Sequence, residues 1–380
     1  MLIINAVIKT IENGDIENGY IIIEENKIKE VGKMSDLKII SPLSSCLDAE
    51  GKIVTPGFVD AHCHIGMWED GLNFEGDDGN EDTDPITPQL NALDAINPMD
   101  RAFKEALDAG VTTVITGPGS ANAIGGQLIA MKTYGQRIDH MIIKAPVAVK
   151  AALGENPKSV YHDKNQTPST RMATAALIRE ALYKAKEYME ELDDYQESPE
   201  ENDKPSYDAK CEALLPVLRQ EIPLHIHAHR ADDIFTAIRI AKAFHIKLVL
   251  VHGTEGHLIA DALKDEGYPI LTGPILTDRS KPELNNQSEK TPAILHAAGL
   301  PIAITTDHPE VPLKHIRLCA AVAIRAGLSP AAALSALTLW PAQICGIDDR
   351  VGSIVPGKDA DLLLWNGDPL DIYSTPKRIV

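Results

Sequence analysis

The sequence has few aromatic residues and no long uninterrupted apolar run. Phe, Trp and Tyr together make up 4% of its 380 residues. The longest apolar stretch, residues 318–339, is interrupted by Arg325 and Pro330, so it is a poor candidate for a membrane-spanning helix. The N-terminal residues MLIINAVIKTIENG lack the basic start and the cleavage site of a signal peptide. We therefore expect no membrane association.

Cysteine and positive charge are also scarce. The five cysteines are odd in number and include no CxxC pair, which excludes a cysteine-rich zinc module and fits a reducing compartment, so we expect a cytoplasmic protein. The chain has 36 Lys and Arg against 55 Asp and Glu, for a net charge of -19, and it has no basic patch. Because such a surface repels polyanions, nucleic acid is not an expected partner.

What the sequence does contain, from residue 53 onward, is an alternation of short apolar runs with helical stretches. Near-continuous apolar runs are typical of parallel strands buried on both faces. Eight of them interleaved with helices predict an α/β fold, a (β/α)₈ TIM-like barrel. The connection between the third and fourth runs, TYGQRIDH, is too short for a good crossover helix, so a doubly wound sheet is the alternative. The eight predicted strands are 53–60, 111–116, 127–131, 141–149, 222–227, 247–252, 268–271 and 301–306.

The two ends of the chain have a different texture, with short strands and turn signals in place of helices. Because chain termini often lie close together, we expect residues 1–52 and 345–380 to form one small composite β-sandwich domain. The barrel would then span residues 53–344. Within it, residues 166–213 read as a helical insertion followed by an acidic linker.

Histidine and aspartate gather where the predicted strands end. The first strand ends in Asp-Ala-His-Cys-His at 60–64, the fifth in His-Ile-His-Ala-His at 225–229, the sixth in His252 and the eighth in Asp307. In a barrel the carboxyl ends of the strands share one rim, and a His-x-His pair on a strand points both rings to one side. Since His and Asp are zinc ligands, the pattern predicts a metal site at this rim.

The same segments resemble the amidohydrolase superfamily. VTPGFVDAHCH is similar to its opening signature, and IHAH, LVHG and TTDHP are similar to its later metal-site strands. The segments AGLSPAAALSALTLWPAQICGI and GSIVPGKDADLLLWNGDPL resemble its C-terminal signature, so the resemblance spans nearly the whole chain. The motifs GVTTV and ALGENPK are closest to the imidazolonepropionase-like and prolidase-like branch.

The resemblance implies a set of metal ligands. His62 and His64 would hold a first ion, with Asp307 as its axial ligand. His227 and His252 would hold a second ion, or His227 would complete a mononuclear site. The resemblance implies a divalent metal, one or two ions, with zinc as the first expectation and manganese or iron as alternatives.

Binuclear members of the superfamily also need an anionic bridge between the ions. Lys150, carboxylated at its amine, is the favoured candidate, because a neutral or carbamylated lysine beside dications costs less than an ammonium group. Glu155 is the alternative bridge. His229 is a candidate substrate contact and the second choice for a catalytic residue.

The sequence therefore predicts a metal-dependent hydrolase of an amide-like C–N bond, in a cyclic amide or a small peptide-like molecule. Metal-activated water would attack the carbonyl carbon, and Asp307 would act as general base. The alternatives are a deaminase of the same superfamily and a non-catalytic scaffold that retains the fold. The expected partner is a small-molecule substrate, and a homo-oligomer is compatible with the sequence.

Overall fold

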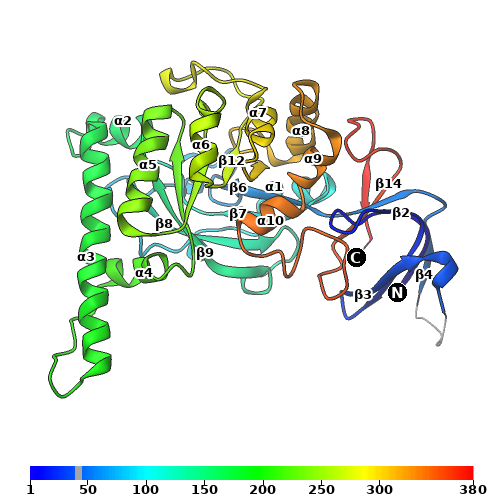
Figure 1. Cartoon of the computed structure of the whole chain (residues 1–380), viewed down its shortest axis with the longest axis horizontal. Helices are drawn as coiled ribbons and strands as arrows, with labels where there is room; N and C mark the ends of the chain where they lie inside the picture. Colours follow the sequence, from blue (N-terminus) through cyan, green and yellow to red (C-terminus); the bar gives the residue numbers. More distant parts are fainter. Residues whose placement is uncertain (39–44, 380) are drawn as a thin grey trace.

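The computed structural model describes residues 1–38 and 45–379 and contains two β-sheets. The larger one has eight strands in sequence order and forms a nearly closed barrel, which confirms the predicted fold class (Figure 1). Its strands are β6 (Phe58–Cys63), β7 (Val111–Thr116), β8 (Ile124–Lys132), β9 (Ile142–Ala152), β10 (Leu224–Ala228), β11 (Leu248–His252), β12 (Ile270–Thr272) and β13 (Ile302–Ile304).

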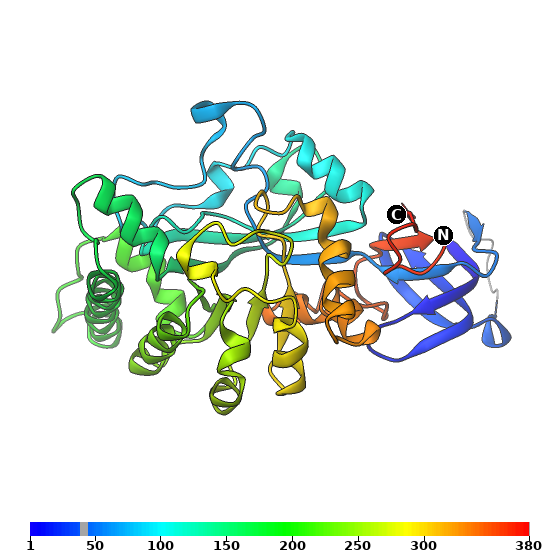
Figure 2. The same cartoon turned by 90° about the horizontal axis from the view of Figure 1, so that it is seen from above.

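Helices cover the outside of the second half of this sheet, where they lie side by side when the molecule is seen from above (Figure 2). They bury apolar faces against the strands, as the fully buried Ile234, Ala237 and Ile240 illustrate. The α-helices are α1 (Arg101–Asp108), α2 (Glu155–Asp163), α3 (Arg171–Glu197), α4 (Ala209–Leu218), α5 (Ala231–Phe244), α6 (Ala260–Glu266), α7 (Thr291–Ala297), α8 (Ile316–Arg325), α9 (Pro330–Ser335) and α10 (Leu339–Ile344).

The third barrel strand departs from the predicted parallel arrangement. Strand β8 pairs antiparallel with both β7 and β9. Its link to β9, residues 133–141, holds only a 3-10 turn at Ile138–His140, so the chain reverses direction there. A parallel neighbour needs a crossover of a dozen or more residues, which this link cannot supply. Because the strand order stays consecutive from β6 to β13, the doubly wound alternative is wrong.

The two ends of the chain form the second sheet, which has seven strands. Its order is β15-β14-β5-β1-β2-β3, with β4 paired to β1. The first predicted run is divided at Gly57, since β5 belongs to this sheet and β6 begins the barrel. Both termini lie in it (Figure 1). Its strands are β1 (Leu2–Lys9), β2 (Asp15–Glu24), β3 (Lys27–Lys33), β4 (Cys46–Asp48), β5 (Ile53–Pro56), β14 (Leu362–Trp365) and β15 (Pro376–Arg378).

The helical insertion consists of α3 and α4, which contact each other at the end of the molecule farthest from the terminal sheet (Figure 1). The Thr170 side chain caps α3 by accepting from the N–H of Ala173. The Tyr188 hydroxyl of α3 donates to Glu212 of α4 at 2.6 Å.

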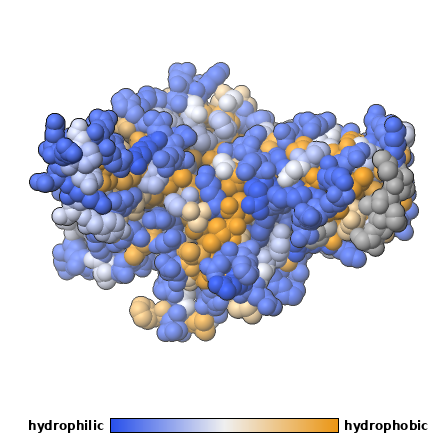
Figure 3. All heavy atoms as spheres, turned by 90° about the horizontal axis from the view of Figure 1, so that it is seen from below, coloured by the Kyte–Doolittle hydropathy of each residue, from blue (hydrophilic) through white to orange (hydrophobic). Residues whose placement is uncertain are grey.

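None of the helices among the described residues is both long enough and apolar enough to cross a membrane. The face in Figure 3 is mostly hydrophilic, with apolar residues gathered in a strip near its middle.

The barrel closes between its first and last strands through one buried carboxylate. Asp60, on β6, accepts from the backbone N–H of its neighbour His62 at 3.0 Å. Across the seam it accepts from the hydroxyl of Thr305 at 2.5 Å, and from the N–H and hydroxyl of Thr306 at 3.0 and 2.6 Å. The N–H of Asp307 also reaches the carbonyl of His62, at 3.2 Å. These bonds hold the end of β6 against the segment that follows β13.

A buried cluster of charges joins the terminal sheet to the barrel. Lys132, at the end of β8, pairs with Asp361 and lies 2.9 Å from Asp359. Asp359 also pairs with Lys27 of β3 at 2.5 Å and with Arg350 at 2.8 Å. Burial alone would raise the pKa of Asp359, but hydrogen bonds from Arg350, Lys132 and Lys27 outweigh it and hold that pKa well below its usual value.

Asp60→Asn should weaken the contact between β6 and the segment after β13. The amide would place an N–H group, which donates, opposite the groups of Thr305 and Thr306 that now donate to the carboxylate. With about two charge-assisted hydrogen bonds lost, we expect the free energy of unfolding in urea to fall by roughly 2–4 kcal/mol. The comparison is Thr87→Val, which removes a buried neutral hydroxyl that donates to the carbonyls of Ile124 and Gly125 at the start of β8, and it should lower the free energy of unfolding by less. Equal losses for the two variants would contradict the closing role of Asp60.

Lys132→Met should be strongly destabilising, since it leaves Asp359 and Asp361 buried without their shared cation. Breaking a buried pair from one side costs about 3–5 kcal/mol, which chemical unfolding can measure. The matched control is Lys104→Met, which breaks the exposed pair with Asp108 and should cost about 0.2–1 kcal/mol. A loss as small as that of the control would mean that the cluster does not stabilise the junction.

The same cluster predicts a pH dependence. Because Asp359 binds its proton more weakly in the folded than in the unfolded chain, its stabilising contribution is present above about pH 4 and is lost as the pH falls below that value. The stability difference between the wild type and Asp359→Asn should therefore shrink in urea titrations between about pH 6 and pH 2. A difference that stays constant over this range would be inconsistent with the lowered pKa.

Candidate metal centre

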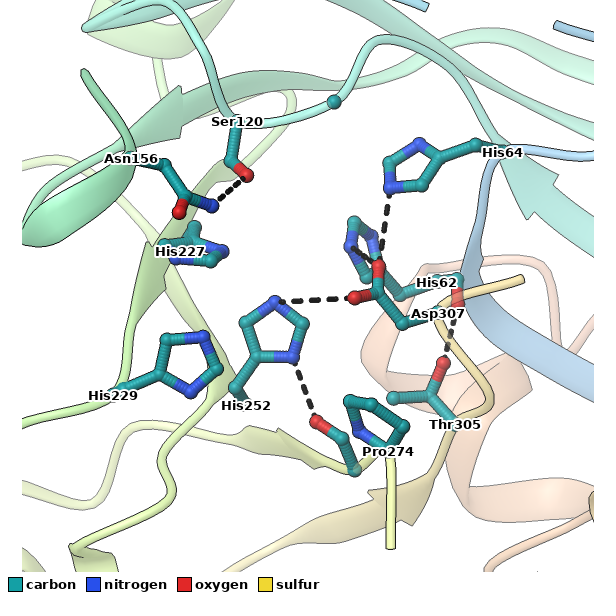
Figure 4. Close-up of polar contacts among 12 residues, drawn as sticks. His62, His64, Ser120, Asn156, His227, His229, His252, Pro274, Thr305 and Asp307 are labelled. Carbon is teal, nitrogen blue, oxygen red and sulfur yellow. Dashed lines mark hydrogen bonds and ion pairs between the residues drawn. The ribbon is translucent and has the colours of Figure 1, made fainter. Parts of the chain in front are cut away.

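The predicted site residues meet at the carboxyl ends of the barrel strands. His62 and His64 come from the end of β6, His227 from β10, His252 from β11, and Asp307 follows β13. Each of these histidines is buried. Two groups of potential metal ligands result, and in each the ligand atoms lie within 4.8 Å of one another. The groups are His62, His64 and Asp307, and His227, His229 and His252 (Figure 4).

In the first group two imidazoles converge on one carboxylate oxygen. The Nε2 atoms of His62 and His64 lie 3.2 and 3.1 Å from Oδ1 of Asp307. Nδ1 of His64 donates to the carbonyl of Gly117 at 2.7 Å. Burial lowers the pKa of His62 to about 4, so its ring is neutral and one of its nitrogens keeps a lone pair. Because carboxylate oxygens also carry lone pairs, acceptors face one another here. A cation between them would turn this repulsion into attraction.

The second group repeats this chemistry. Nδ1 of His252 donates to the carbonyl of Gly273 at 2.7 Å, so the lone pair lies on Nε2, 4.0 Å from Oδ2 of Asp307 (Figure 4). Both ring nitrogens of His227 are buried without a hydrogen-bond partner among the described residues. The ring of His229 stacks on that of His252, with centroids 4.5 Å apart. Burial lowers the pKa of His227, His229 and His252 well below the usual value, so all three are neutral bases.

Two of the converging residues have a strained backbone. His252 has φ 75° and Asp307 has φ 54°, in the left-handed region that residues with a Cβ rarely adopt. His252 is the last residue of β11, and Asp307 follows β13. Strain of this kind costs of order 1–3 kcal/mol per residue and clusters at functional sites.

The two candidate bridging residues lie in different surroundings. Lys150 is fully buried inside the barrel, where its amine donates to the carbonyl of Gly119 at 3.0 Å and burial lowers its pKa to about 8. Asp307 is the carboxylate whose charge opposes this shift. Glu155, at the first position of α2, turns its carboxylate to the N–H of Glu283 at 3.3 Å. Glu155 therefore faces a loop, whereas Lys150 faces the interior that the histidines share.

Two buried residues that sequence reasoning did not single out as site residues also lie here. His225 points into the barrel beside Lys150, with neither ring nitrogen hydrogen-bonded within the described chain. Since it lies two residues before His227, strand alternation could have placed both rings on one side. Glu283 follows β12, whose end bears no histidine. No local pattern marks this glutamate, because it lies deep in a loop well past the strand.

A cavity of about 440 Å³ opens over the two groups. Its size falls in the usual range for small-molecule sites. On one side, the amide of Asn156 donates to the Ser120 hydroxyl at 2.7 Å and accepts from the amine of Lys281 at 2.9 Å. On the other side, Trp68 packs edge-on against His64. The cavity thus joins the candidate metal ligands to a polar wall that can orient a small molecule.

The chain is similar to known amidohydrolases. The chain is 29% identical to the amidohydrolase tasK of Hapsidospora irregularis over 95% of its own length, but it spans only 39% of that protein. It is 25% identical to an imidazolonepropionase of Flavobacterium psychrophilum, over 94% of this chain and 87% of the relative. These matches fit the branch that the sequence motifs indicated.

The structural comparison is stronger. A crystal structure of an amidohydrolase from Thermotoga maritima MSB8 superposes with a TM-score of 0.95 at 44% identity, covering 100% of this chain and 97% of the other. The model of the family described as "Amidohydrolase family" matches residues 53–379. From the buried histidine and aspartate groups at the barrel rim and this match over most of its length, we conclude that the chain belongs to the amidohydrolase family of C–N bond hydrolases.

Proposed function

We propose that this protein hydrolyses an amide-like C–N bond in a cyclic amide or a small peptide-like molecule, with one or two divalent metal ions bound at the barrel rim. The observation that carries the proposal is the convergence of buried ligand atoms in the two groups, where imidazole nitrogens and a carboxylate oxygen lie within 4.8 Å of one another in each group. Burying so many acceptors together is unfavourable unless a positive charge satisfies them.

The donor set suits zinc. His62, His64 and Asp307 would hold one ion and His227 and His252 another, and imidazole nitrogen with carboxylate oxygen is a set that zinc prefers. The carbonyls of Gly117 and Gly273 fix the tautomer of His64 and His252, as the outer partners of metal-bound histidines usually do. When bound, such an ion polarises a carbonyl group and makes water acidic enough to ionise near neutral pH.

Lys150 would supply the bridge between the two ions. With a pKa lowered to about 8 by burial, its amine is neutral in a useful fraction of molecules near neutral pH, and only the neutral amine can be carboxylated. The interior position of Lys150 favours it over Glu155, whose carboxylate accepts from Glu283.

Asp307 is the residue that would move the proton. It follows β13 at the mouth of the barrel, where it contacts both histidine groups and lines the cavity. From there its carboxylate can accept a proton from the attacking water and deliver it to the leaving nitrogen. Asn156, Ser120 and Lys281 form the wall against which the substrate would be oriented.

The direct test is a hydrolysis screen of cyclic amides, N-acyl amino acids and dipeptides with protein loaded with zinc or manganese. We expect hydrolysis of the C–N bond in at least one of these classes, with ring opening of a cyclic amide or release of a free amino acid from an N-acyl amino acid or a dipeptide. Turnover only of aminated heterocycles, with release of ammonia from the ring, would instead support the deaminase alternative. The absence of any hydrolysis by metal-loaded protein would contradict the proposal.

Metal removal tests whether the proposed hydrolysis depends on a bound ion. The purified protein should contain one or two equivalents of a divalent transition metal by elemental analysis, and chelation should abolish hydrolysis until zinc is restored. His227→Ala should lose at least one equivalent, because it removes a ligand from the second group. His140→Ala, which removes an exposed histidine away from the site, should keep the wild-type content. Full activity in a metal-free preparation would refute the mechanism.

Asp307→Asn separates metal binding from proton transfer. Asparagine retains an oxygen that can contact the metal but cannot accept the proton, so the variant should keep most of its metal. Because general acid–base groups contribute about 10²–10⁴ in rate, kcat should fall by at least that factor while KM changes little. Metal content and steady-state kinetics should be measured on one preparation. Near-normal turnover with full metal would identify another residue as the base, and His229 would be tested next.

A further inference from the structure

Glu283 brings a buried carboxylate to the second histidine group. It lies in the 3-10 turn Pro282–Leu284, within the loop that follows β12, and its side chain is fully buried. Its Oε1 atom lies 3.8 Å from Nε2 of His227 and 3.7 Å from Nε2 of His229. That oxygen has no hydrogen-bond partner among the described residues. A buried carboxylate oxygen is therefore aimed at two imidazoles without a bond to either.

The other side of this carboxylate is held in place. Its Oε2 atom accepts from the N–H of Glu155 at 2.9 Å, while the Glu155 carboxylate accepts from the N–H of Glu283 at 3.3 Å. Gly154, with φ +85°, leaves the room that Oε2 occupies, because a Cβ there would lie 2.9 Å from that atom. These contacts orient Glu283 so that Oε1 faces the histidines.

Nearby cations do not neutralise Glu283. The amine of Lys281 donates to Asn156, and Arg171 pairs with Asp233 at 3.0 Å. Within the described residues, the basic atoms recorded within 4.0 Å of its carboxylate belong only to His227 and His229. Leaving a carboxylate oxygen buried without a partner is costly, whereas a divalent ion at this point would satisfy it together with the imidazoles.

The distances suit a shared ion. Two ligands of a tetrahedral zinc, each about 2.0–2.2 Å from the metal, lie roughly 3.3–3.6 Å apart. The separations of Glu283 from His227 and His229 exceed that range by only a few tenths of an ångström, a movement that a side chain makes easily. His252 completes the group from β11.

We propose that Glu283 is a fourth protein ligand to an ion held by His227, His229 and His252. This inference rests on the proposed function. Four protein ligands close a tetrahedral zinc site, whereas three leave one position for water. The two groups would then differ in ligand number, since the group with Glu283 has one more protein ligand of its own than His62, His64 and Asp307 provide, and it should retain its ion more tightly.

The test is calorimetric titration of metal-free full-length protein with zinc. Loss of partners that only orient metal ligands costs 10–100-fold in affinity, so Glu283→Gln, which loses a ligand and its charge, should weaken one zinc site by about 100-fold or more. Glu289→Gln is the matched control, because it removes the same charge from an exposed pair with Arg325. It should leave both zinc affinities unchanged.

The outcomes separate this inference from the proposed function. If the wild type binds no zinc, the proposed function fails together with the inference. If the wild type binds zinc and Glu283→Gln binds it with equal affinity, only the role of Glu283 is overturned. A crystal structure of zinc-loaded wild type covers the case in which the variant fails to fold. Oε1 of Glu283 should then lie within about 2.2 Å of an ion, and a carboxylate that stays beyond about 3 Å would overturn the inference.

Discussion

The candidate site depends on the seam that Asp60 closes between the first and last barrel strands. Strands β6 and β13 lie at opposite ends of the strand order, yet the first ligand group takes its histidines from one and its aspartate from the segment after the other. Asp60 joins them by accepting from both Thr305 and Thr306. Burial raises the pKa of this carboxyl to about 6, so ionising it has a cost that the hydrogen-bond donors around it offset only in part.

A second constraint is the low polarity of the barrel interior. Burial keeps the imidazoles of His62, His227 and His252 neutral, and the backbone carbonyl of Gly273 then decides which nitrogen of His252 carries the hydrogen. Both ring nitrogens of His62, His225 and His227 are buried without a hydrogen-bond partner among the described residues. We propose that a bound metal ion supplies the positive charge that these acceptors share, which would couple metal affinity to folding.

Parts of the molecule farther from the rim hold the barrel strands in position. The antiparallel β8 keeps the sheet continuous where the chain has no crossover helix. The charge cluster around Asp359 ties the terminal sheet to the end of β8, so the strands that precede and follow the barrel are anchored to its wall. Loops at the opposite rim are then free to form the cavity, in which Asn156 links Ser120 to Lys281.

The sequence by itself determined the barrel class, the pairing of the chain ends and the rim histidines, because apolar runs, strand alternation and strand ends are local features of the chain. It did not reveal the direction of β8, which is set by how a short link turns. It also did not reveal Glu283, which reaches His227 only because a long loop folds back onto the start of α2. The sequence likewise did not reveal the ion pair of Lys132 with Asp361, because these residues lie far apart in the chain. Such contacts were decided by tertiary structure alone, because no periodicity relates residues that meet only through the path of the loops and sheets between them.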